Sequence, residues 1–331
     1  MHTFGTIFRI SIWGASHAPS LGIRIDGVPA GIALSVADFE PDIARRRSGA
    51  AGTTPRREAD IPVLSGGIAD GVTTGGTLEI AFANSNTRST DYDEFRTHPR
   101  PSHADFTVRA KYGDGMDLRG GGMFSGRMTL PLVAAGVVAK KILGDVRFAS
   151  SLVEVGGERN PDEFARVVAE AVAAHDSVGG VVECRAAGVG IGLGEPFFDS
   201  AESVISHLMF SVPAVKGIEF GSGFGGVRLR GSERNDRIAD AEGHTFSNNE
   251  GGIVGGITNG NEIVVRVALK PTPSIAAPQQ TFDFAEGRVA PLCIRGRHDA
   301  CIALRASVVV EAAVAIALAD LKLRNAAHVH P

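Results

Sequence analysis

"RGGGMFSGRMTLPLVAAGVVAKKILG", residues 119–144, is a glycine-rich loop that leads directly into an apolar helix, with Ser125 and Arg127 at the junction. The first N–H groups of a helix have no partner inside it and carry partial positive charge, so such a junction can bind an anion. The same residues also suit a capped helix in the protein core. The stretch alone leaves both interpretations open.

The segments around this helix predict an α+β fold. Apolar and β-branched residues alternate in four segments, which predicts strands at 4–13, 76–83, 179–189 and 261–270. Helical patterns occupy 160–175, 200–212 and 306–324. These elements do not alternate as regular β-α-β units, which favours an α+β architecture over a doubly wound sheet. No low-complexity linker or internal repeat divides the chain, so we expect one domain over residues 1–331.

The composition excludes several classes of protein. The net charge of −4 argues against a nucleic-acid or membrane-surface binder, which needs a surplus of basic residues. No apolar stretch is long enough to span a bilayer, and the first residues lack a signal-peptide pattern. Three cysteines without paired spacing suit a reducing compartment, so we expect a cytoplasmic protein without a membrane or nucleic-acid partner.

Arginine dominates the basic residues, with 27 of 33, and five of them fall in "RRRSGAAGTTPRREAD" at 45–60. Planar guanidinium groups bind carboxylates and phosphates in a bidentate way. Such a loop fits a substrate with several negative charges, although a solvated basic turn would have the same composition. "GSGFGG" at 221–226 matches the dinucleotide pattern only in its letters, because no helical pattern follows it.

Three segments place histidines in constrained loops: "WGASHAP" at 13–19, "HPRPSHADF" at 98–106 and "RGRHDACI" at 295–302. His17 is therefore either a working acid or a structural turn residue. In the third segment the spacing of histidine, aspartate and cysteine matches no zinc pattern, so we expect no metal. A carboxylate beside a fixed guanidinium stays ionised and can serve as a base.

Taken in order, these motifs resemble one family, chorismate synthase. The resemblance runs from "FGTIFRISIWGASHA" through "RRRSG", "TTPRREAD", "RPSHADFT", "RGGGMFSGR", "AVKGIEFGSGF" and "KPTPS" to "GRHDACI", and so covers nearly the whole chain. It implies a sandwich of helices packed between antiparallel-rich sheets. It also implies a homotetramer that converts 5-enolpyruvylshikimate-3-phosphate (EPSP) to chorismate by anti-1,4-elimination, in the shikimate pathway. The implied cofactor is reduced FMN, with NADPH as an external reductant only.

The resemblance also implies roles for individual residues. His17 would protonate the departing phosphate, His103 would protonate the flavin, and Asp299 would help to take the C6 proton. The implied substrate-binding residues are Ser16, Arg46, Arg100, Ser125, Arg127 and Arg297. The implied FMN-binding residues are Met123, Phe124, Ser125, Ala214, Gly255, Lys270, Pro271, Thr272, Pro273, Ser274 and Arg297.

Two motifs depart from the family pattern. The first histidine motif usually reads G-E-S-H-G, whereas this chain has Ala15 and Ala18 on either side of Ser16 and His17. A glutamate there would favour the charged imidazolium, and Ala18 requires an ordinary backbone angle that glycine would not. Met123 and Phe124 replace the usual Arg-Ser, which leaves only their backbone groups for an expected contact. These departures motivate an alternative, a non-catalytic paralogue that binds FMN or the phosphorylated substrate.

Overall fold

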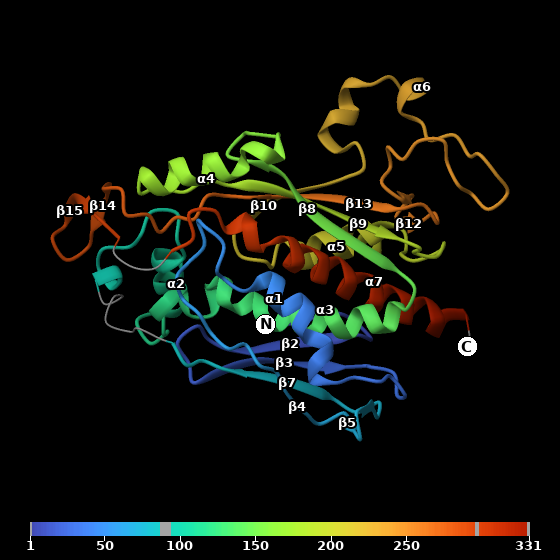
Figure 1. Ribbon diagram of the computed structural model, residues 1–331, viewed down its shortest axis with the longest axis horizontal. Helices are drawn as coiled ribbons and strands as arrows, with labels where there is room; N and C mark the ends of the chain where they lie inside the picture. The colour runs from blue at the N-terminus through green and yellow to red at the C-terminus, as the bar shows by residue number, and fades with distance from the viewer. Residues whose placement is uncertain (1, 87–93, 295–297, 330–331) are drawn as a thin grey trace.

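A computed structural model describes residues 2–86, 94–294 and 298–329 of the chain. Two antiparallel sheets enclose a layer of helices (Figure 1), which confirms the predicted α+β sandwich. The first sheet has five strands in the order β1-β2-β3-β7-β4. Its strands are β1 (Thr3–Phe4), β2 (Arg9–Gly14), β3 (Ser20–Asp26), β7 (Leu78–Ala83) and β4 (Val63–Ser65).

The second sheet has four strands in the order β10-β13-β9-β8, all paired antiparallel. Its strands are β10 (Val215–Phe220), β13 (Ile263–Leu269), β9 (Gly180–Ala187) and β8 (Arg147–Val155). Three hairpins complete the described strands: β5 (Ile68–Ala69) with β6 (Val72–Thr73), β11 (Ile253–Val254) with β12 (Ile257–Thr258), and β14 (Gln279–Asp283) with β15 (Arg288–Leu292).

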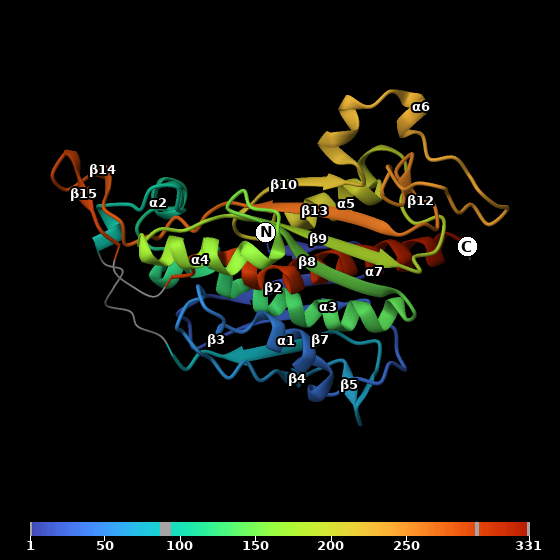
Figure 2. The same cartoon turned by 45° about the horizontal axis from the view of Figure 1, so that its top comes forward.

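The helices between the sheets form the centre of the core. α3 (Thr129–Leu143) packs on β2, β3 and β7, whereas α7 (Ser307–Val329) packs on β8 and β9, and the two helices pack on each other (Figure 2). One continuous cluster of buried apolar side chains joins both sheets through these helices. On this packing we propose that the chain forms one domain. The remaining helices are α1 (Glu40–Arg46), α2 (Asp105–Tyr112), α4 (Phe164–Ala173), α5 (Ala201–Met209) and α6 (Gly231–Arg234).

The strand predicted at 4–13 is interrupted between β1 and β2. Gly5 adopts a positive φ of 93°, which turns the chain out of the strand. The next three N–H groups, from Thr6 to Phe8, donate to Asp320 Oδ1 of α7 at 2.8–3.0 Å. A buried carboxylate on the last helix thus replaces the strand partner of these amides and fixes the start of β2 against the core.

Several elements end at one place and so position the loops between them. The turn at 15–19 joins β2 to β3, and Ser20 of β3 pairs with Ala83, the last residue of β7. In the other sheet Val215, the first residue of β10, pairs with Leu269, the last residue of β13. The loops that follow or precede these ends line the same cavity as the start of α3.

Candidate active site

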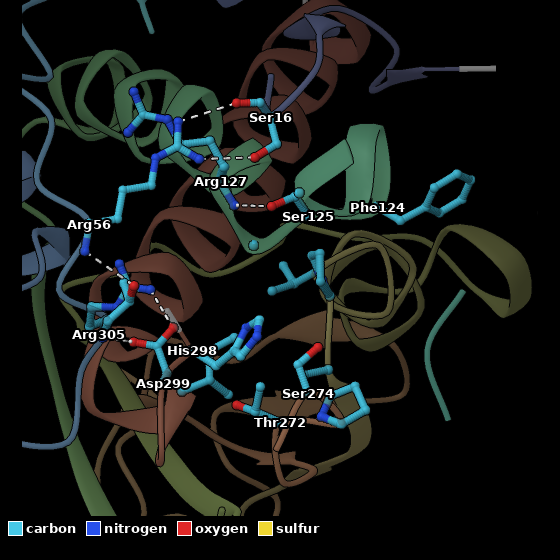
Figure 3. Close-up of a pocket in the computed structure, with 18 of the residues that line it drawn as sticks. Ser16, Arg56, Phe124, Ser125, Arg127, Thr272, Ser274, His298, Asp299 and Arg305 are labelled. Atoms are coloured by element: carbon cyan, nitrogen blue, oxygen red, sulfur yellow. Dashed lines mark hydrogen bonds and ion pairs between the residues drawn. The ribbon is translucent and has the colours of Figure 1, made fainter. Parts of the chain in front are cut away.

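A cavity of about 830 Å³ lies where these loops meet. Ser16, Arg127 and Ser125 lie together on one side of it, and Asp299 and Arg305 lie together on another (Figure 3). Among the described residues that line it, nine are lysine or arginine and three are aspartate or glutamate. A net positive charge in a concave site attracts anions and raises their local concentration.

The histidine turn is held by Arg56 and Asn84, two residues outside it. Arg56 Nη1 donates to Ser16 Oγ at 3.1 Å and Nη2 donates to the Ser16 carbonyl at 3.2 Å. The Asn84 amide donates to the carbonyls of Ala15 and Ala18 at 3.1 and 2.7 Å. Ala18 is not among the described residues with positive φ, so the alanine causes no backbone strain here.

His17 is half-buried at the cavity wall and hydrogen-bonds to the backbone of Arg119. Burial lowers the pKa of His17 below its ordinary value, and the positive charges of Arg56 and Arg119 lower it further. The Arg119 backbone bond and the Asp117 carboxylate act in the opposite direction. His17 is therefore mainly neutral at neutral pH without substrate, and an anion beside it would favour its charged form.

Arg127 is buried and oriented by two other side chains. Its Nη1 donates to Asp60 Oδ1 at 2.5 Å, and its Nε donates to Asn84 Oδ1 at 3.1 Å. Its Nη2 is buried without a hydrogen-bond partner among the described residues. A buried donor left without a partner costs about 1–3 kcal/mol, so this nitrogen is suited to a ligand oxygen.

Arg46 lies behind Arg127 and binds the protein backbone. Its Nε donates to Thr129 Oγ1 at 3.0 Å, and its Nη2 donates to the Gly126 and Arg127 carbonyls at 2.8 and 3.3 Å. Burial, with the charges of Arg305 and Arg127, lowers the pKa of Arg46 to about 9. Arg46 therefore stays charged at neutral pH and fixes the start of α3, where Arg127 stands.

Arg100, His103 and Asp105 form a second cluster at the start of α2. Arg100 binds Asp105 through Nε and Nη2 at 2.8 and 2.7 Å, and its Nη1 donates to Ser274 Oγ at 3.1 Å. His103 Nδ1 lies 2.7 Å from Asp105 Oδ1. Arg100 Nη2, which can only donate, lies 3.0 Å from the same Nδ1. The contact with the carboxylate is the shorter one and a carboxylate can only accept, so we assign the proton to Nδ1, which leaves Nε2 as the nitrogen that can gain or give a proton.

The charges in this cluster set its protonation. Burial alone would raise the pKa of Asp105, but hydrogen bonds from Arg100 and His103 hold it far below its ordinary value. Burial lowers the pKa of His103, against the opposing effect of the Asp105 hydrogen bond. Asp105 is therefore ionised, and His103 is a mainly neutral imidazole with a fixed orientation.

Asp299 lies at the opposite wall, 9% exposed, with both oxygens engaged. Oδ1 accepts from the Thr54 N–H at 2.9 Å, and Oδ2 accepts from Arg305 Nη2 at 2.6 Å. A carboxylate has about four lone-pair sites, so it retains capacity to accept a further proton or hydrogen bond. Asp299 is thus a hydrogen-bond acceptor held in one orientation beside the cavity.

A family model, several relatives and a solved structure match this chain, and all of them carry the same family name. A family model described as chorismate synthase matches residues 8–323. A chorismate synthase of Chitinophaga pinensis is 55% identical over 324 residues, covering 98% of this chain and 97% of the relative. One from Dehalococcoides mccartyi is 43% identical over 98% of this chain and 97% of the relative. The chain belongs to the chorismate synthase family.

A solved structure titled as a crystal structure of chorismate synthase superposes with a TM-score of 0.75 at 28% identity, covering 97% of this chain and 93% of the other. Chorismate synthase eliminates phosphate from EPSP to form chorismate, and this is the activity of the chain. It makes the chain a carbon–oxygen lyase of the shikimate pathway. The family uses reduced FMN.

The structure brings most of the residues expected from the chorismate synthase resemblance to one cavity. Those that line it are Ser16, His17, Arg46, Arg100, His103, Met123, Phe124, Ser125, Arg127, Ala214, Lys270, Thr272, Pro273, Ser274 and Asp299. Pro271 is exposed and packs toward Gly179, and Gly255 lies in the exposed β11–β12 turn, so neither is at the cavity. Arg297 lies outside the described residues.

Sequence reasoning missed several lining or supporting residues, namely Arg47, Arg56, Arg57, Asp60, Asn84, Lys216 and Arg305. The arginine-rich run at 45–60 pointed in general terms to three of them, Arg47, Arg56 and Arg57. In the structure Arg46, Arg47, Arg56 and Arg57 line the cavity, whereas Arg45 turns away and pairs with Glu311 of α7. No local pattern distinguishes Arg45 from Arg46, because the choice depends on which helix each faces.

The part of the cavity around Thr272 and Lys270 fits a flavin mononucleotide. Thr272 Oγ1 is buried and has no hydrogen-bond partner within the described ranges. Ala214 has a positive φ of 73°, and its carbonyl accepts from the Lys270 N–H at 2.9 Å. Lys270 and Lys216 supply positive charge beside them. A cavity of this size is in the range of cofactor sites, about 300–1,000 Å³.

In the part of the chain that the structure describes, no group of three or more histidine, cysteine, aspartate or glutamate side chains could hold a metal ion. None of its helices combines the length and the apolar composition needed to cross a membrane.

Proposed function

We propose that the cavity binds EPSP with its phosphate toward Arg127, Ser16 and His17. The observation that carries the proposal is the threefold excess of basic over acidic side chains around one cavity. EPSP has a phosphate and two carboxylates, which match such a site. The unpartnered Arg127 Nη2 and the Ser16 hydroxyl supply oriented donors for phosphate oxygens.

In this proposal the residues around His17 assist departure of phosphate. The C–O bond breaks with its electron pair on the phosphate oxygen, and a proton leaves C6 on the opposite face of the ring. Preorganised positive charge at Arg127 stabilises the phosphate as its charge grows. His17 donates a proton or hydrogen bond to it, and such general acids contribute about 10²–10⁴ in rate.

We propose that reduced FMN binds in the part of the cavity around Thr272 and Lys270, where it would supply electron density to the breaking C–O bond. Lys270, Thr272, Pro273, Ser274 and Ala214 would hold it, together with the backbone of Met123, Phe124 and Ser125. His103 would offer its other ring nitrogen, Nε2, to the flavin. Asp299 would accept the C6 proton or orient its removal. Pro271 and Arg297 stay in the proposed FMN set only by resemblance.

We further propose a cytoplasmic homotetramer that uses NADPH only as an external reductant. Large apolar side chains such as Phe197, Phe198, Phe224 and Val227 are 76–92% exposed, which favours burial against another copy. Gly255 is exposed away from the cavity of its own chain, so it would reach FMN only in another copy. Size-exclusion chromatography with light scattering tests the oligomer.

The cavity proposal is tested by adding EPSP and photoreduced FMN to the purified protein without oxygen. Chorismate and phosphate should form at equal rates. An Arg127→Ala variant should lose at least about tenfold in kcat/KM, since a charge-assisted bond contributes about 1.5–3 kcal/mol. Arg185→Ala, which removes an exposed arginine from β9, should match the wild type. A wild-type kcat/KM in Arg127→Ala would contradict the proposed place of the phosphate.

A further inference from the structure

The imidazole of His17 lies directly against the Cα of Gly120. A Cβ atom built at position 120 would overlap His17 Cε1, and would lie 2.5 Å from His17 Nδ1 and 2.9 Å from Ser16 Oγ. Ordinary contacts between such atoms are about 3.5–4.0 Å. Only glycine therefore allows the ring to occupy this position.

The backbone around Gly120 is fixed to the histidine turn. The Ser16 N–H donates to the Gly122 carbonyl at 3.1 Å, and the Gly121 N–H donates to Leu118 O at 2.9 Å. The three glycines from 120 to 122 all have positive φ, between 53° and 84°. The loop thus has one defined shape, and the Arg119 backbone within it bonds to His17.

Asp117 and Arg119 place charges beside the same ring. Arg119 donates to Asp117 from its backbone N–H at 3.1 Å, from Nε at 2.9 Å and from Nη2 at 2.7 Å. Both side chains are roughly half exposed, so the pair is screened by salt. Among the charged groups that act on His17, Asp117 is the carboxylate, opposed by Arg119 and by Arg56 from the 53–62 loop.

We propose that the segment 117–120 is the positioning device for His17. In it, Gly120 sets the place of the ring, Arg119 holds it through the backbone, and Asp117 supplies the negative charge that Ala15 lacks. This inference rests on the proposed role of His17 as proton donor. Gly120 and Asp117 touch neither substrate nor cofactor in this account, and they act through the imidazole.

The first test is a double-mutant cycle. Gly120→Ala should displace the ring and lower kcat by at least about tenfold, with a smaller effect on KM. In a His17→Ala background the same change should cost less than about twofold, because the group it displaces is gone. An equal loss of kcat in both backgrounds would overturn the role of Gly120.

Backbone strain at position 120 needs its own control. Gly287→Ala places a side chain at a similar positive φ, 68° against 59°, in the exposed β14–β15 turn with open space around it. It should cost stability without lowering kcat. If Gly287→Ala lowers kcat as much as Gly120→Ala, strain alone explains the effect and the proposal fails.

The second test measures the pKa of His17 without turnover, so its result does not depend on the proposed function. NMR titration of the imidazole, assigned with a His17→Gln variant, gives the pKa of His17 in the ligand-free protein. Asp117→Asn should lower this pKa, and the difference should shrink in high salt. Asp114→Asn removes an exposed carboxylate of the same loop that pairs with Arg109, and should leave the pKa unchanged. An unchanged pKa in Asp117→Asn would overturn the role of Asp117.

Discussion

Asn84 Oδ1 accepts a hydrogen bond from Arg127 Nε at 3.1 Å, while the same amide donates to Ala18 O at 2.7 Å. One side chain at the end of β7 thus links Arg127, which we propose binds the phosphate, to the turn that carries His17. Arg127 and His17 are 110 positions apart, but Asn84 gives them a shared orientation. Asn84 therefore positions both the proposed acid and the proposed phosphate-binding arginine.

Asn84→Ala should release both groups at once. Loss of these hydrogen bonds should lower the free energy of unfolding by about 1–3 kcal/mol and kcat/KM by at least about tenfold. Chemical denaturation and steady-state kinetics measure the two effects. Asn261→Ala removes an asparagine that bridges backbone groups far from the cavity, between Thr245 and Gly243. It should cost stability only, and a matching kinetic loss there would contradict the linking role of Asn84.

Asp105→Asn should lower the pKa of His103 and destabilise the protein. Asp105 raises the pKa of His103 against the lowering effect of burial, so its removal should move the His103 titration to lower pH. It also leaves the buried Arg100 guanidinium without its carboxylate, which should cost about 3–5 kcal/mol of stability. NMR titration and thermal unfolding measure these changes. Asp240→Asn removes the exposed partner of His244 and should leave both turnover and stability nearly unchanged.

Glu58 should make the protein sensitive to acid. Burial alone would raise its pKa, but hydrogen bonds from Ser85, Arg56 and Asn86 lower it from 4.5 to about 2. Because the folded value is depressed, this stabilisation is complete above about pH 4.5 and is lost as pH falls toward 2. Urea unfolding of Glu58→Gln should therefore depend less on pH in this range. An exposed control, Glu286→Gln, should follow the wild type, and a wild-type slope in Glu58→Gln would contradict the assignment.

Much of the fold followed from local patterns. The helix predicted at 306–324 is α7, and the strands predicted at 76–83, 179–189 and 261–270 are β7, β9 and β13 with slightly different ends. These elements bury one face or more, and burial selects apolar residues at regular spacing. The break at residues 5–8 was not predictable in this way, because it depends on Asp320, more than 300 positions away.

The site was predictable in part for a similar reason. The resemblance carried residues such as His17, His103 and Arg127, which stand in quoted motifs. It gave no role to Asp60, the last residue of "TTPRREAD", or to Asn84, because the importance of both depends on tertiary contacts with Arg127. Nor did it distinguish Arg46, whose guanidinium binds the backbone before α3, from arginines whose guanidinium groups can bind a ligand in the cavity. The direction in which a side chain points depends on tertiary contacts with distant segments, which a local sequence pattern does not contain.

We propose that His17 assists phosphate departure in this cavity. The most direct measurement is the rate of chorismate formation by the wild type and by His17→Ala, without oxygen, at saturating EPSP and reduced FMN. We expect a rate at least about tenfold lower in the variant, with EPSP still bound. Equal rates in the two proteins would contradict it and make His17 a structural residue of its turn.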